Sequence, residues 1–138
     1  GVPKYEYGKI MLKIDEKKKL ESLTFFKILS KSKNYSFLVV QPITGRKHQI
    51  RNHLNSIGNP IVGDLKFDYK KTNSTLFSSN LYLHAYSLKF KEKNGQIREF
   101  HALPPDYFST TINKMELKLS LINRKLGFEN KKKYKLIE

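Results

Sequence analysis

The sequence predicts an α+β domain in which a mixed, mainly antiparallel β-sheet is flanked by helices. Strand-like segments follow one another as hairpins, and the strand–helix–strand alternation of a parallel sheet is missing. One helical segment separates the strands into two groups, and a second helical segment follows them. The length of 138 residues is enough for one hydrophobic core and too short for two.

Three strands are predicted in the first 42 residues. Apolar residues alternate along 10–14, aromatic and β-branched residues fill 23–29, and alternation returns along 35–41 before Pro42. Only the polar turn Lys-Ser-Lys-Asn separates the last two segments. We therefore expect these two strands to form a hairpin.

A helix is predicted over residues 46–57. Ile50, Leu54 and Ile57 are spaced i, i+4 and i+7, so they share one face. The side chains that fall roughly opposite are polar or cationic: His48, Arg51, Asn52 and Asn55. Gly58 can take the left-handed cap conformation that ends a helix. By spacing alone, the segment is also typical of an ordinary amphipathic surface helix.

The later part of the chain should contain a hairpin followed by a helix. Residues 59–80 are loop-like, and strands are predicted over 81–91 and 96–102 around an Asn-Gly turn. A helix is expected over 106–126, with one apolar seam that packs on the domain or, as the alternative, on a second copy. The basic tail 131–135 is expected to be mobile.

The composition favours a polyanionic partner. Lysine and arginine number 27 against 12 acidic residues, which gives a formal net charge of +15. Nucleic acid is the first candidate and a membrane surface the second. No apolar run approaches the roughly 20 residues of a spanning helix. The lack of cysteine fits a cytoplasmic protein, and neither metal-ligand spacing nor a phosphate-loop glycine pattern is present.

The segment with the most functional information is 44–54, Thr-Gly-Arg-Lys-His-Gln-Ile-Arg-Asn-His-Leu. It resembles the T-G-R-x-H-Q-[IL]-R-x-H segment of the RluA-type ribosomal RNA pseudouridine synthases, which include RluA, RluC and RluD. Residues 58–64 resemble the G-H-P-I-x-G-D turn of that family. Residues 83–90 resemble its L-H-A-x-x-L-x-F strand, and 100–104 its F-x-A-x-x-P ending. A looser likeness covers 24–29, and together the motifs span residues 8–108 in family order.

The resemblance implies the later half of a pseudouridine synthase fold. Residues 1–108 would form the C-terminal part of the catalytic domain, and residues 109–138 its C-terminal helix and basic tail. The implied activity is isomerisation of uridine to pseudouridine in RNA, with large-subunit ribosomal RNA as the expected substrate. Because the chain begins at Gly1 and not at methionine, we expect a piece of a longer protein.

The resemblance also implies a catalytic role for Arg51. The family's nucleophilic aspartate lies in an R-L-D segment upstream of T-G-R, and the chain contains no such segment. The isolated chain is therefore expected to be inactive. Arg51 matches the arginine expected to pair with that aspartate, since a guanidinium stays charged and presents a planar fork. The alternative for Arg51 is a solvated or phosphate-binding arginine. Asp64, in the G-D turn, is expected to be structural.

RNA contacts are expected from residues near the start of the predicted helix: Arg46, Lys47, His48 and Gln49, with Ile50 packed near the active site. For His48, an RNA contact and a hydrogen bond to a backbone carbonyl remain equal alternatives. His53 and His84 are expected to be structural.

Two functions follow from these features. The first is part of an RNA pseudouridine synthase, acting as a monomer in the cytoplasm without a metal, cofactor or membrane partner. The alternative is a noncatalytic RNA-binding module associated with ribosomes.

Overall fold

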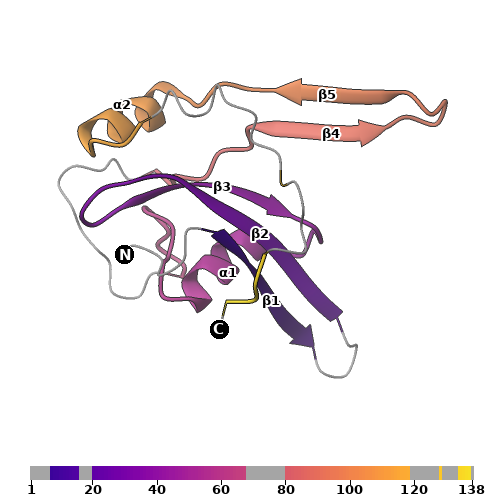
Figure 1. Ribbon diagram of the computed structural model, residues 1–138, viewed down its shortest axis with the longest axis horizontal. Coiled ribbons are helices and arrows are strands. Elements are labelled where there is room, and N and C mark those ends of the chain that lie inside the picture. Colours follow the sequence, from indigo (N-terminus) through magenta and orange to yellow (C-terminus); the bar gives the residue numbers. More distant parts are fainter. Residues whose placement is uncertain (1–6, 16–19, 68–79, 119–127, 129–133, 138) are drawn as a thin grey trace.

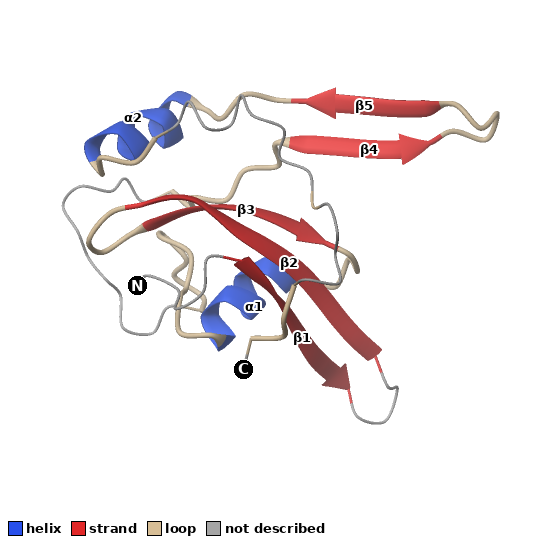
Figure 2. Cartoon of the chain, in the orientation of Figure 1, coloured by secondary structure: helices blue, strands red, loops and turns tan. Residues whose placement is uncertain are grey.

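The computed structural model describes residues 7–15, 20–67, 80–118, 128 and 134–137. Its elements are β1 (Tyr7–Asp15), β2 (Leu20–Lys31), β3 (Ser36–Pro42), α1 (Gln49–Ser56), β4 (Ser87–Lys91), β5 (Ile97–His101) and α2 (Asp106–Lys114). Strands β1, β2 and β3 form one antiparallel sheet in that order, and β4 and β5 form a second (Figures 1 and 2). The α+β class is confirmed, although the strands divide between two sheets.

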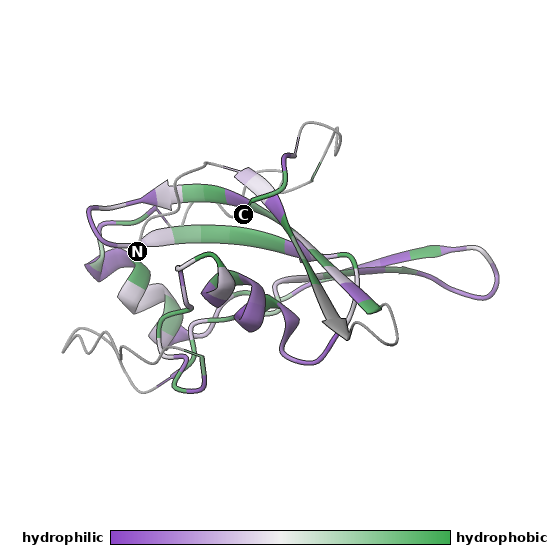
Figure 3. Ribbon diagram, turned by 90° about the horizontal axis from the view of Figure 1, so that it is seen from below, coloured by the Kyte–Doolittle hydropathy of each residue, from purple (hydrophilic) through white to green (hydrophobic). Residues whose placement is uncertain are grey.

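Helix α1 lies against the three-stranded sheet and closes the first hydrophobic core. Figure 1 shows it beneath β1 and β2, and the long strands above it carry apolar stretches (Figure 3). Four buried residues form this core: Ile10, Phe26, Leu54 and Ile61. Ile50 and Ile57 of the predicted helical stripe pack against it, so the apolar face of the helix was predicted correctly.

The end of the chain adds a parallel segment to the free edge of β1. The N–H of Lys9 donates to the carbonyl of Lys135 at 3.0 Å, and the N–H of Ile137 donates to the carbonyl of Lys9 at 2.9 Å. This parallel bridge is isolated, and the pairings between the named strands are all antiparallel, which agrees with the prediction of a mainly antiparallel sheet. Tyr134 is only 2% exposed, and its ring lies 5.3 Å from that of Phe25. The prediction of a mobile tail is therefore wrong for residues 134 and 135, and residues 131–133 lie outside the described part.

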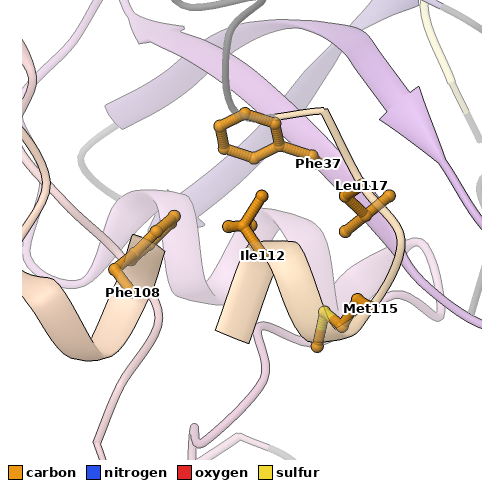
Figure 4. Packing of buried hydrophobic residues seen from close by; sticks show 5 residues of the cluster. All are labelled: Phe37, Phe108, Ile112, Met115 and Leu117. Carbon is orange, nitrogen blue, oxygen red and sulfur yellow. The ribbon is translucent and has the colours of Figure 1, made fainter. Parts of the chain in front are cut away.

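Helix α2 packs on the start of β3 through a second core. Its buried members are Phe37, Phe108, Ile112, Met115 and Leu117, which Figure 4 shows at close range. The helix ends earlier than predicted because Glu116 is left-handed, with φ 60°, and the N–H of Leu117 donates to the carbonyl of Ile112. That turn directs Leu117 back into the core. Residues 119–126 of the predicted helix lie outside the described part.

Strands β4 and β5 form a ribbon that extends from the body of the molecule (Figure 1). Asn94 and Gly95 lie in its turn as predicted, but the N–H of Glu92 donates to the carbonyl of Gln96, so the loop has three residues and not the two expected for an Asn-Gly turn. Gly95 has φ +86°, and the side-chain oxygen of Asn94 accepts from the N–H of Gln96. The preceding residues 81–86 were predicted as strand but are irregular. There the N–H of Tyr82 donates to the carbonyl of Val62, and the Tyr82 hydroxyl bonds that of Thr111, so tertiary contacts replace a sheet ladder.

Gly63 lies where the loop after α1 meets Asn80. Its φ is +81°, and an added Cβ would lie 1.9 Å from the Asn80 carbonyl oxygen. Gly58 is a matched control, because its φ is +80° and nothing lies within 4 Å of its Cβ position. We predict that Gly58→Ala costs about 1–2 kcal/mol of unfolding free energy through backbone strain, and that Gly63→Ala costs about 1–3 kcal/mol more through the collision. Urea denaturation measures both variants, and equal losses would contradict the predicted collision.

Candidate functional site

Gln49 fixes the turn that precedes α1. The side chain is 5% exposed. Its oxygen accepts hydrogen bonds from the Thr44 hydroxyl at 2.6 Å and from the N–H of Arg46 at 3.1 Å. Its amide nitrogen donates to the Leu23 carbonyl and to the Thr24 hydroxyl, both at 2.9 Å. The contacts thus favour a structural role for Gln49 in place of the expected RNA contact.

The helix begins at Gln49, three residues later than predicted. His48 has φ 51°, a left-handed conformation that is uncommon for residues other than glycine and that interrupts helical geometry. Arg46 and Lys47 therefore lie in an exposed turn, where the Arg46 Nε donates to the Glu21 carbonyl at 3.3 Å. The turn places both cations outside the helix, on the surface next to its first residue.

Arg51 and Asp64 form a bidentate ion pair that joins α1 to the loop after it. The Nη2 of Arg51 donates to Oδ1 at 2.8 Å and its Nε donates to Oδ2 at 3.0 Å. Asp64 is 2% exposed, and its Oδ1 also accepts the backbone N–H groups of Lys66 and Phe67, each at 3.2 Å. Burial alone would raise the pKa of Asp64, but these hydrogen bonds and the charge of Arg51 lower it below its usual range.

Two rings lie beside the guanidinium of Arg51. Phe67 has its ring centroid 5.3 Å from the Arg51 Cζ and 5.6 Å from the Lys66 Nζ. The Nδ1 of His48 lies 3.5 Å from the Arg51 Nη1. Because arginine only donates, this contact requires an unprotonated Nδ1. Desolvation and the neighbouring cations Lys66, Arg51 and Lys47 lower the pKa of His48, which favours the neutral ring.

The structure brings together only part of the predicted site. His48 and Arg51 meet on one side of α1, whereas Gln49 is buried and Ile50 packs on the core. Sequence reasoning missed Lys66 and Phe67. The signal that could have found them is their position two and three residues after Asp64, where backbone N–H groups readily bond an aspartate side chain. Asp64, which was expected to be structural, is buried and has Arg51 as its partner.

The two other predicted structural histidines are both hydrogen-bonded. His53 is 1% exposed, and its Nε2 lies 2.7 Å from the Ser22 hydroxyl. His84 donates from Nε2 to the Ala102 carbonyl at 2.7 Å. His53 thus joins α1 to β2, and His84 joins the segment before β4 to the residue after β5.

Neither a metal cluster nor a membrane span is found in the described part of the chain. No three histidine, cysteine or acidic residues lie close enough there to hold a metal ion. Among those same residues, no helix has the length and hydropathy required to cross a membrane.

Comparisons with known proteins relate this chain to a family. A model of the family described as RNA pseudouridylate synthase matches residues 2–56. The ribosomal large subunit pseudouridine synthase C of Buchnera aphidicola is 39% identical over 111 residues, which cover 78% of this chain and 35% of that protein. The protein of the same name from Haemophilus influenzae is 36% identical over 99 residues, covering 69% of this chain and 30% of its own length.

The solved structure of human RNA pseudouridylate synthase domain containing 4 shares the fold, with a TM-score of 0.69. Its sequence is 22% identical, and the match covers 86% of this chain and 59% of the human one. The chain belongs to the RNA pseudouridylate synthase family, as its motifs predicted. Its match falls in the C-terminal part of the curated relatives, and it spans about a third of their length.

The contacts of Gln49 predict a large effect on stability. We expect Gln49→Leu to cost about 2–4 kcal/mol of unfolding free energy, because the buried Thr24 hydroxyl and three part-buried partners lose their hydrogen bonds to the Gln49 side chain. Lys47→Ala is the control two positions away and should stay within about 0.5 kcal/mol, since Lys47 is exposed. Urea denaturation of both variants checks this. A Gln49→Leu variant as stable as the Lys47→Ala variant would show that the buried network contributes little.

His53 predicts a pH dependence of stability. Desolvation lowers its pKa in the folded state below the ordinary value of 6.5. The unfolded chain then binds more protons below about pH 6.5, so the free energy of unfolding should decrease as the pH falls from there toward the folded-state pKa. Denaturation at several pH values between about 7 and 5 should show a weaker decrease for His53→Gln than for the wild type. Parallel profiles would assign the decrease to other groups.

Proposed function

We propose that this chain is part of an RNA pseudouridine synthase that converts uridine to pseudouridine, with large-subunit ribosomal RNA as substrate. The observation that carries the proposal is Arg51, which lies in the matched family motif and is held by Asp64 beside other cations. The names of the bacterial relatives support a ribosomal substrate. We also propose that the protein acts in the cytoplasm as a monomer, in keeping with the absence of cysteine.

The chemistry requires a carboxylate that Asp64 is not placed to supply. Pseudouridine formation breaks the glycosidic bond, turns the base and rejoins it through carbon, with the nucleotide taken out of its stack. Asp64 accepts four N–H groups and is buried, so its oxygens are engaged. In the family, the nucleophilic aspartate lies in a segment that this chain lacks. We therefore assign Arg51 the role of keeping that aspartate ionised and oriented.

We assign the binding of RNA phosphates to the exposed cations around Arg51. Arg46 and Lys47 lie in the exposed turn before α1, and Lys66 is exposed beside Phe67. Their charges match the phosphate backbone, which accounts for most contacts in protein–nucleic acid complexes. The ring of His48 can exchange hydrogen bonds with RNA. Ile50 supports the site from the core, and Gln49 shapes the turn.

The roles of Arg51 and Lys47 can be separated in the full-length natural protein. We predict that Arg51→Lys lowers turnover by about 100-fold or more, because lysine keeps the charge but loses the planar fork that orients a carboxylate. RNA affinity should stay within about threefold. Lys47→Ala should instead weaken RNA binding and reduce the salt slope by about one, with turnover at saturating RNA nearly unchanged. Pseudouridine formation and RNA affinity are measured for each variant on the same transcript.

The outcomes distinguish the two candidate functions. If Arg51→Lys weakens binding alone, Arg51 belongs with the phosphate contacts. A wild-type protein that binds RNA with a steep salt dependence but forms no pseudouridine would refute catalysis and favour the noncatalytic RNA-binding module.

A further inference from the structure

Arg51 is restrained on two sides before any substrate binds. Asp64 engages its Nε and Nη2 atoms, which fixes the plane of the guanidinium. Phe67 lies 5.3 Å from its Cζ, within the range of a cation–π contact. Both restraining residues come from the same short loop, since backbone N–H groups of Lys66 and Phe67 bond the Asp64 carboxylate. One loop thus sets the position of one guanidinium.

The ion pair is open on the arginine side only. The side chain of Asp64 is 0% exposed and that of Arg51 is 20% exposed. Nη1 takes no part in the bonds to Asp64. Among the hydrogen bonds described, its one partner is the Nδ1 of His48, at the long distance of 3.5 Å. The guanidinium therefore has N–H donors left for a further acceptor. The carboxylate is buried and already accepts four N–H groups, so it is not open to a further donor.

Stability alone gives a weak reason for such a pair. A buried ion pair loses hydration on both partners, and apolar residues of similar volume often serve the fold as well. A guanidinium locked in place, in contrast, has already lost its rotamer freedom when it meets a second oxyanion. The restraint therefore lowers the entropy that Arg51 loses when it binds a second oxyanion.

We propose that Asp64 and Phe67 are positioning residues, which hold the guanidinium of Arg51 so that its free N–H donors face the reacting carboxylate. This inference rests on the proposed function. Asp64 acts only through Arg51 and does not touch the substrate. Because its negative charge balances that of Arg51, the pair contributes directed hydrogen bonds more than net positive charge.

A double-mutant cycle in the full-length natural protein tests this assignment. Asparagine is isosteric with aspartate and keeps an oxygen for the loop N–H groups, but it loses the charge that binds Arg51. We expect Asp64→Asn to lower kcat by about 10-fold to 100-fold with KM for RNA within about threefold. In the Arg51→Lys background, the same substitution should change kcat by less than about threefold, because its target is gone. Equal factors in the two backgrounds would overturn the proposal.

Two further variants help to distinguish the positioning role from a general effect of substitution on the protein. Phe67→Leu removes the ring but leaves the ion pair, and should lower kcat by about threefold to tenfold without changing KM. Asp106→Asn is the matched control, because Asp106 is exposed in the first turn of α2, and should behave as the wild type. A Phe67→Leu variant with unchanged kcat would remove Phe67 from the assignment.

A measurement without turnover tests the restraint itself. In full-length protein labelled with ¹⁵N-arginine, the Nε–H of Arg51 should exchange slowly with water, and this protection should disappear in Asp64→Asn. Fast exchange in the wild type would overturn the proposal. If the wild type forms no pseudouridine, the proposed function fails, and this resonance alone then decides whether Asp64 restrains Arg51.

Discussion

The ion pair between Arg51 and Asp64 is the interaction on which the site depends. Arg51 lies in the first turn of α1, and Asp64 lies in the loop that follows the helix, so the pair joins the start of the helix to that loop. The buried carboxylate needs the guanidinium to compensate its lost hydration. The guanidinium needs the carboxylate to keep one orientation. The burial of Asp64 and the orientation of Arg51 therefore depend on each other.

The surrounding fold provides a rigid base for this pair. Leu54 anchors α1 on the sheet core, and the buried amide of Gln49 ties the first residue of the helix to β2. On the other side, Gly63 permits a close approach of Asn80 that no larger residue would allow. The chain before and after the helix is thus fixed by contacts that do not involve Arg51. A charged group held in this way loses little entropy when it meets a partner.

Local patterns were reliable where the physical cause was local. The apolar stripe of α1 and the hairpin of β2 and β3 appear as the spacing predicted. Gly58 ends α1 in the left-handed conformation, and the Asn94-Gly95 turn joins β4 to β5. Boundaries were less predictable: His48 delays the start of α1, and Glu116 ends α2 early. Neither residue type signals a break, and the residue that follows each of them, Gln49 or Leu117, is buried against segments far away in the sequence.

The sequence by itself determined the class of the fold and the family, because these follow from periodicity and from motifs in a fixed order, and it singled out Arg51 as a candidate. Only the tertiary structure decided which side chains meet. It buried Gln49 in a network and brought Phe67 against Arg51, and it placed Tyr134 of the expected tail at the edge of β1. These outcomes depend on the packing of segments far apart in the chain, and residue order alone contains no distance between them.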